Sequence, residues 1–286
     1  MSQKIVKKIV LGSAQFGLKY GVNNKSGIVK YKEMKNIMNY AFSNGINTID
    51  SSIFYGASLD KIIKYLEEHK NQVWNINLKH NNNFNLNEKI SHIKKINPNN
   101  KIELMLHSFE NFKKNFYINK ENYFNKKKYS FSLYKIKELN FLLNNKIKIK
   151  TIQAPGNLFD KRFVSNNILE ILKSYNIKLH VRSLFLQGLF FMKKPKLLKI
   201  HPELKTTLNK ISKIQLKYNL NLYQLSLVAI IYNKNVNRVV LGFDNIQQFK
   251  SIINFLKNCK IDNFLISELD KISFNMYKII LPTEWK

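Results

Sequence analysis

Four side chains that can donate, accept or steady a proton follow short β-branched segments of the chain, at Asp50, Tyr55, Lys79 and His107. A tyrosine hydroxyl, with an ordinary pKa of about 10, is too weak an acid for work at neutral pH unless a neighbouring ammonium favours the phenolate. A charged Lys79, aimed by Asp50, would supply that field, and a neutral His107 would orient a carbonyl oxygen. The four groups together suit a general acid that protonates a developing alkoxide.

Each of these residues also has an ordinary structural explanation. An Asp at a strand end often caps the next loop, a loop Tyr is often only a packed ring, and lysine is abundant throughout this chain. A single His is more often a satisfied structural residue than a catalytic one. The joint placement at three successive strand ends is what favours catalysis. The quartet includes no nucleophile beside a base and no metal-ligand cluster, so we expect no metal.

The elements that position these residues follow from the hydrophobic pattern. Runs rich in β-branched residues alternate along the chain with stretches of helical spacing. In a parallel barrel, reactive residues come from the C-terminal ends of the strands, where the quartet stands. The predicted strands are Lys8–Leu11, Ile46–Asp50, Val73–Lys79, Ile102–His107, Tyr129–Leu133, Ile149–Ala154, Lys178–Ser183 and Arg238–Gly242.

Helices are predicted between the strands, where apolar residues recur on one face. The first ends at Gly45, the second is capped by Ser58, and the third ends before Pro98. The segment Phe109–Lys128 is basic and carries no firm apolar stripe. Later helices are predicted over Lys135–Leu143, Asn167–Tyr175, Pro202–Asn233, from Asn245 onward and over Ile266–Met276.

Eight such strand and helix units in 286 residues predict an α/β fold, the (β/α)8 TIM barrel, with residues 1–286 as a single domain. A doubly wound sheet would need a Gly-rich phosphate turn after the first strand, and Gly12 and Gly17 have the wrong spacing for it. No apolar run approaches the roughly 20 residues of a membrane-spanning helix, and Met1–Phe16 lacks the core of a secretory signal. We therefore expect a cytoplasmic protein without a membrane partner. The single Cys259 excludes an internal disulfide.

The net charge of +30 arises from 48 Lys and Arg against 18 Asp and Glu. Only three of the basic residues are arginine, and the lysines are spread along the whole chain. Proteins that read nucleic acid concentrate basic side chains on one face and rely on arginine, so we favour a compositional bias and expect no nucleic-acid partner. A less favoured hypothesis makes the charge itself the function, through nucleic acid or an anionic membrane. Some attraction for anionic small molecules should remain.

The segment Gly45–Gly56 resembles the GxNxxDTAxxYG signature of the aldo-keto reductases, NAD(P)H-dependent carbonyl reductases built on the (β/α)8 barrel. Lys79 and His107 fall where the other members of that family's Asp-Tyr-Lys-His tetrad belong. The likeness extends nearly over the whole chain and includes Leu11–Gly17, Gln153–Asp160 and Leu241–Asp244.

The resemblance implies a role for each of these positions. Tyr55 would be the proton donor, Lys79 and Asp50 would set its acidity, and His107 would orient the carbonyl of a small-molecule substrate. The cofactor would be NADP(H) or NAD(H), and it would pass a hydride to the carbonyl carbon. A helix N-terminus near Asn245 is also a physically reasonable anion site. The implied cofactor-binding residues are Gly12, Ser13, Ser132, Gln153, Arg182, Ser183, Gly188, Gly242, Asp244 and Gln248.

The sequence departs from the family pattern in the implied cofactor site. Leu133 follows Ser132 where Asn is usual, and Arg182 replaces the aromatic ring that commonly stacks on the nicotinamide. Asp244 stands where Ser, Lys or Arg would indicate a 2′-phosphate, so the choice between NADPH and NADH stays open. These departures motivate an alternative function, a barrel with a decayed cofactor site that acts as a binding or regulatory module. The stretch between His107 and Ser132 is also shorter than usual.

The segment Leu184–Gly188 is similar to bacterial reductases of sugar and surface-glycan metabolism. The similarity implies a polar carbonyl substrate such as a sugar. The loops after the first, fourth and seventh strands should shape the substrate pocket, through Phe16, Phe109, Phe185 and Leu186. The oligomeric state does not follow from the sequence.

Overall fold

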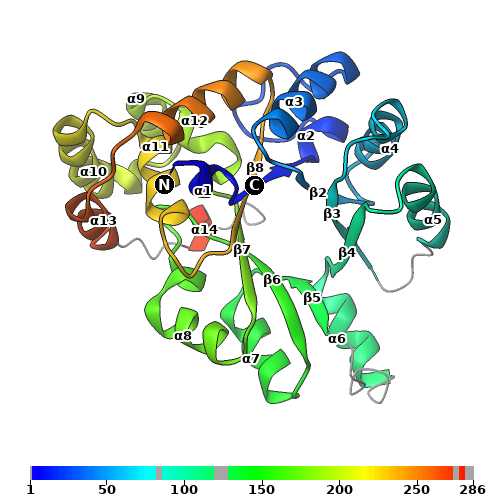
Figure 1. Ribbon diagram of the computed structural model, residues 1–286. Helices are drawn as coiled ribbons and strands as arrows, with labels where there is room; N and C mark the ends of the chain where they lie inside the picture. Colours follow the sequence, from blue (N-terminus) through cyan, green and yellow to red (C-terminus); the bar gives the residue numbers. More distant parts are fainter. Residues whose placement is uncertain (1, 82–85, 119–127, 273–276, 281–286) are drawn as a thin grey trace.

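A computed structural model describes residues 2–81, 86–118, 128–272 and 277–280. Its centre is a closed barrel of parallel strands in the order β1-β2-β3-β4-β5-β6-β7-β8, and β8 pairs with β1 (Figure 1). This arrangement confirms the predicted (β/α)8 barrel. The strands are β1 (Ile9–Gly12), β2 (Thr48–Ser52), β3 (Asn75–His80), β4 (Lys101–Leu106), β5 (Tyr129–Ser132), β6 (Ile149–Pro155), β7 (Lys178–Arg182) and β8 (Arg238–Gly242).

The strand register explains why the predicted catalytic residues meet. Ser52 on β2 lies beside Lys79 on β3. Asp50 is two residues before Ser52, and alternate residues of a strand face the same side of the sheet. Asp50 and Lys79 therefore both point into the barrel, where they are only 1% and 2% exposed.

Helices surround the barrel and follow the strands in chain order (Figure 1). None of the helices in the described residues has the length and hydropathy needed to span a lipid bilayer. The helices are α1 (Ser2–Val6), α2 (Ala14–Gly17), α3 (Tyr31–Ser43), α4 (Ser58–Glu68), α5 (Asn87–Ile96), α6 (Phe109–Ile118), α7 (Ile136–Asn144), α8 (Asn166–Ser174), α9 (Lys194–Ile200), α10 (Lys205–Tyr218), α11 (Leu222–Ile231), α12 (Ile246–Asn258), α13 (Asn263–Asp270) and α14 (Tyr277–Ile280), with 3₁₀ turns η2 (Arg162–Val164), η3 (Leu186–Phe191) and η4 (Pro202–Leu204).

Four expectations about the helices need correction. The segment after β4 does form a helix, α6, because Phe112 and Phe116 at i and i+4 supply a buried face. Residues 119–127 of that segment lie outside the described part. The stretch Pro202–Asn233 is interrupted at Asn219, whose φ of +51° is left-handed and ends α10 before α11 begins.

Ser58 does not cap α4, contrary to the prediction. Ala57 occupies the N-cap position, and the Ser58 hydroxyl donates to the carbonyl oxygen of Ser13 at 2.9 Å. The hydroxyl thereby ties α4 to the loop after β1. The last predicted helix is displaced toward the N-terminus, as α13, and residues 273–276 lie outside the described part.

Two apolar clusters hold these elements together. The larger one joins the barrel strands to the surrounding helices, with Trp74 and Phe131 among its fully buried members. The second joins α9, α10, α11 and α13 to the loop after β7, through Leu186, Leu189 and Phe190. Burial of each of these side chains contributes about 2 kcal/mol to the free energy of folding. The second cluster therefore anchors the β7 loop at the barrel mouth.

The buried His180 on β7 generates a prediction about acid stability. It is 6% exposed, and its Nδ1 has no hydrogen-bond partner among the described residues. Burial lowers the pKa of His180 from 6.5 to about 4, so between these pH values the unfolded chain binds a proton that the folded chain does not. Stability contributed by neutral His180 is therefore lost as the pH falls from 6.5 toward 4.

We expect the native protein to lose about 2 kcal/mol more than a His180→Asn variant between pH 6.5 and pH 4.5. Urea denaturation of both proteins across this range measures the difference. Parallel stability curves would contradict the assignment of a neutral, buried His180.

Candidate active site

Asp50, Lys79 and Gln153 form a buried ring of polar contacts at the C-terminal mouth of the barrel. Lys79 Nζ lies 2.7 Å from Asp50 Oδ2 and donates to Gln153 Oε1 at 2.9 Å. Gln153 Nε2 donates to Asp50 Oδ1 at 2.6 Å and closes the ring. The three side chains come from β2, β3 and β6. The closed sheet therefore fixes their mutual positions.

Lys79 also donates to the hydroxyl oxygen of Tyr55 at 2.9 Å. Burial alone would lower the pKa of Lys79, but the charge of Asp50 and the contacts with Tyr55 outweigh burial and hold that pKa above its ordinary value. Lys79 is thus an ammonium, whose three N–H groups are directed at Asp50, Gln153 and Tyr55. Because the Tyr55 oxygen accepts from Lys79, the single hydroxyl hydrogen of Tyr55 is left to point elsewhere.

His107 follows β4 and packs beside Tyr55 with the two rings nearly perpendicular and their centroids 6.1 Å apart. Burial, together with the positive charges of Lys79 and Arg182, lowers the pKa of His107 to about 4. The ring is therefore neutral near pH 7. Its Nδ1 lies 3.1 Å from the hydroxyl of Ser52, whose oxygen accepts from the backbone N–H of Phe54. Donation from the Ser52 hydroxyl to Nδ1 corresponds to the tautomer of His107 with its hydrogen on Nε2.

The loop that carries Tyr55 is held by a close backbone approach. A Cβ atom on Gly17 would overlap the carbonyl oxygen of Tyr55, and one on Gly56 would lie 2.5 Å from the carbonyl oxygen of Gly17. Gly56 also has a φ of +51°, in the left-handed region that favours glycine. Within the loop, the Tyr55 carbonyl accepts from the backbone N–H of Ser58 at 3.0 Å. These contacts set the height of the Tyr55 side chain above the barrel.

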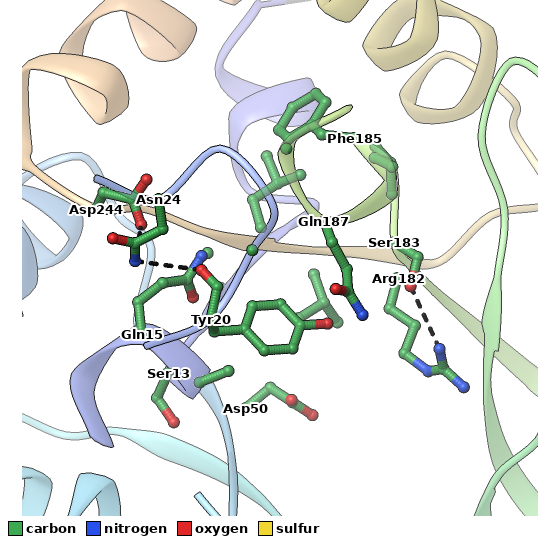
Figure 2. A pocket seen from close by; sticks show the side chains of 18 of the residues that line it. Ser13, Gln15, Tyr20, Asn24, Asp50, Arg182, Ser183, Phe185, Gln187 and Asp244 are labelled. Atoms are coloured by element: carbon green, nitrogen blue, oxygen red, sulfur yellow. Dashed lines mark hydrogen bonds between the residues drawn. The ribbon is translucent and has the colours of Figure 1, made fainter. Parts of the chain in front are cut away.

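A cavity open to solvent adjoins Asp50, Tyr55 and Lys79 at the mouths of β1, β7 and β8. In Figure 2, Asp244 and Asn24 lie on one side of this cavity and Arg182 and Ser183 on the other. His107 instead lines a neighbouring cavity, together with Phe54, Asn81, Ser108, Phe109, Glu110, Tyr134 and Glu138.

The sequence model of the aldo/keto reductase family matches residues 8–124 and 127–273. The chain belongs to the aldo/keto reductase family. The family and the barrel together make it an NAD(P)H-dependent oxidoreductase, as the signature around Asp50 and Tyr55 predicted. Members of this family act on small-molecule carbonyl compounds.

Solved structures of the same fold are similar to this reductase. The aldo-keto reductase AKR11C1 from Bacillus halodurans, in its holo form, has 14% identity and a TM-score of 0.65, and the match covers 93% of this chain and 91% of that one. The thermostable aldo-keto reductase Tm1743, in complex with the inhibitor epalrestat, has 14% identity and a TM-score of 0.61, with coverage of 93% and 94%. At these identities the similarity concerns the fold. A search of curated proteins finds no match.

Nine of the ten residues predicted to bind the cofactor of this reductase line the cavity. The exception is Ser132, which is buried beside Gln153 in the sheet. The Gln153 amide hydrogen-bonds to Lys79 and Asp50, so its described contacts support the polar ring. The nine that line the cavity are Gly12, Ser13, Gln153, Arg182, Ser183, Gly188, Gly242, Asp244 and Gln248.

Arg182, at the end of β7, is fixed by contacts within the barrel mouth. Its guanidinium stacks 4.0 Å above the ring of Tyr134 and donates to the carbonyl oxygen of Leu133 at 3.1 Å. A second donation reaches the hydroxyl of Ser183 at 3.3 Å. Two of the departures from the family pattern, Leu133 and Arg182, are therefore in contact with each other, and Arg182 places a cation at one end of the cavity.

The loop after β1 contributes cavity residues that the sequence analysis missed, chiefly Tyr20 and Asn24. Figure 2 shows the Tyr20 ring within the cavity, between Gln15 and Gln187. The backbone N–H of Val22 donates to the carbonyl oxygen of Gln187, which joins this loop to the loop after β7. Such a loop has no periodic pattern in the sequence. Its contact with Gln187 joins residues that are far apart in the chain, so the sequence alone does not indicate it.

Of the four residues predicted to shape the pocket, two line a cavity and two are buried in the core. Phe185 lines the cavity and Phe109 lines the neighbouring one. Phe16 and Leu186 instead belong to the apolar clusters and are fully buried. They shape the pocket only by supporting its loops.

The close approach at Gly17 can be tested with a single methyl group. We expect Gly17→Ala to destabilise the protein by about 2 kcal/mol and to reduce turnover, because the methyl group must displace the Tyr55 loop. Urea denaturation and steady-state kinetics measure the two effects. A variant with native stability and native turnover would show that the loop does not depend on this contact.

The polar ring predicts a kinetic role for Gln153. We expect Gln153→Leu to lower kcat at least tenfold, because Lys79 and Asp50 each lose a buried hydrogen bond and the ammonium is no longer aimed. Gln3→Leu, at an exposed position of α1, is the matched control and should keep native kinetics. Equal kcat values for the two variants would show that Gln153 has no role in turnover.

Proposed function

We propose that this reductase converts the carbonyl group of a polar small molecule, an aldehyde, a ketone or a sugar, into an alcohol with Tyr55 as the proton donor. The observation that carries the proposal is the hydrogen bond from the Lys79 ammonium to the Tyr55 oxygen beside a cavity. This bond leaves the hydroxyl hydrogen of Tyr55 available to an acceptor in the cavity. It also places a positive charge where the phenolate forms.

The cavity suits a nicotinamide cofactor. It combines polar side chains such as Gln15, Gln187 and Gln248 with backbone at Gly12 and Gly242, and it opens toward solvent. NAD(P)H, when bound, supplies the hydride that adds to the carbonyl carbon. The residues proposed to hold it are the nine cavity-lining positions given above, with Ser132 as part of the supporting sheet.

The protein's own part of the reaction is proton transfer and charge stabilisation. As the carbonyl oxygen gains negative charge, the Tyr55 O–H bond breaks and its proton passes to that oxygen. Lys79 stabilises the tyrosinate, and Asp50 keeps Lys79 charged and in place. A proton from solvent at the open mouth restores Tyr55. The neutral His107, with its hydrogen on Nε2, is proposed to donate a hydrogen bond to the same carbonyl oxygen.

The two cavities support a polar substrate. Tyr20, Asn23 and Arg182 offer hydrogen bonds in the cavity that adjoins Tyr55. The cavity beside His107 adds the aromatic side chains of Phe54 and Tyr134. Flat rings beside hydrogen-bonding groups suit a sugar, which has apolar faces and a rim of hydroxyl groups. In the described residues, no contact favours the alternative of a decayed binding module.

The test of the proposal is the removal of one oxygen atom. We expect Tyr55→Phe to lower turnover of aldehyde and keto-sugar substrates at least a hundredfold, since general acid catalysis typically contributes that much. Binding of NADH or NADPH, measured by calorimetry, should change less than threefold. Tyr175→Phe, at an exposed site beyond α8, is the control for loss of a hydroxyl. Full turnover by Tyr55→Phe would eliminate Tyr55 as the acid.

A further inference from the structure

The cavity beside Tyr55 has two chemically different ends. Lys79 lies near Tyr55, and Arg182 lies at the end of β7. The other end is formed by Asp244 and Gln248, at the start of α12, and no cationic side chain of the described residues lines it. Figure 2 shows Asp244 and Arg182 on opposite sides. A dinucleotide whose nicotinamide lies against Tyr55 must extend toward one of these ends.

The N-terminus of α12 is already occupied by side chains of the protein. The backbone N–H of Ile246 donates to the carboxylate of Glu33, from α3, at 2.6 Å. The N–H of Gln248 donates to the Asn245 side chain, and the N–H of Asp244 donates to the Gln248 side chain, both at 2.9 Å. This changes the sequence-based expectation of an anion site near Asn245, because three of its backbone donors already have acceptors and one acceptor is the carboxylate of Glu33.

Asp244 is a second carboxylate at this end, and it has no cation beside it among the described residues. Its Oδ1 accepts from Asn24 Nδ2 at 3.2 Å, and its Oδ2 lies 3.4 Å from Gln248 Nε2. Burial raises the pKa of Asp244 above its ordinary value, as expected for a carboxylate without an ion pair. A carboxylate accepts about four hydrogen bonds, so Asp244 retains capacity for donors from a ligand.

We propose that Asp244 and Glu33 make this reductase select NADH over NADPH. The inference rests on the proposed function and concerns the adenosine end of the cofactor. Ribose hydroxyl groups are donors that the carboxylate of Asp244 can accept. A 2′-phosphate carries a charge of about −1.5 to −2 at neutral pH and offers only acceptors to the same position. The carboxylates of Asp244 and Glu33 therefore repel a 2′-phosphate. The capped N-terminus of α12 also offers this phosphate few backbone N–H donors.

Calorimetric titration with NADH and NADPH tests the inference without any substrate. We expect the native protein to bind NADH at least tenfold more tightly than NADPH. Asp244→Asn and Glu33→Gln each remove a charge while keeping an acceptor oxygen, so each should lower the ratio at least threefold by strengthening NADPH binding. Glu170→Gln, an exposed position on α8, changes the net charge equally and should leave the ratio unchanged.

The outcomes separate the two proposals. Equal affinities in the native protein, or tighter binding of NADPH, would overturn the inference about Asp244 and Glu33 while leaving the reductase proposal intact. An unchanged ratio in both charge-removing variants would also overturn it. Absence of binding by either dinucleotide would contradict the proposed function itself.

Lys25 provides a further control, because it follows Asn24 in the same loop and is exposed. We expect Lys25→Gln either to weaken the binding of NADH and NADPH by the same factor or to leave the binding of both unchanged. A selective loss of NADPH affinity would identify Lys25 as a partner of the 2′-phosphate, and the inference would then be wrong.

Discussion

A buried ammonium group is the constraint on which the rest of this structure depends. Lys79 is removed from water inside the barrel, which is costly unless its charge is paired and each N–H has an acceptor. Asp50 supplies the countercharge, Gln153 takes the second N–H, and the Tyr55 oxygen takes the third. Electrostatic stability and proposed chemistry therefore have the same origin, because the arrangement that satisfies Lys79 also orients the hydroxyl of Tyr55.

The barrel can satisfy this constraint because each partner comes from a rigid element. Asp50, Lys79 and Gln153 lie on strands whose register is fixed by the closed sheet. Tyr55 is the exception, since it lies on a loop, and the backbone approach of Gly17 and Gly56 compensates for the lack of a strand. The loops after β1, β7 and β8 are in turn joined to one another or to apolar clusters, and they determine what the cavity can hold.

The fold and the proximity of Asp50, Tyr55 and Lys79 could be predicted because both depend on local patterns. Hydrophobic alternation located each strand within two residues, and parallel topology requires that strand ends meet. The remaining features depend on contacts between distant segments. Ser58 looked like a helix cap, yet its hydroxyl bonds to Ser13, and the α12 N-terminus looked free, yet it is bonded to Glu33. The role of Gln153 in the ring also needed coordinates, because sequence alone cannot show that its amide reaches Lys79.

Neutron diffraction from crystals of the protein at neutral pH would test the central claim most directly, because it locates hydrogen atoms. The account predicts three hydrogens on Lys79 Nζ, directed at Asp50, Gln153 and Tyr55, and a Tyr55 hydroxyl hydrogen directed into the cavity. A neutral amine at Lys79, or a Tyr55 hydrogen directed at Lys79 Nζ, would contradict it.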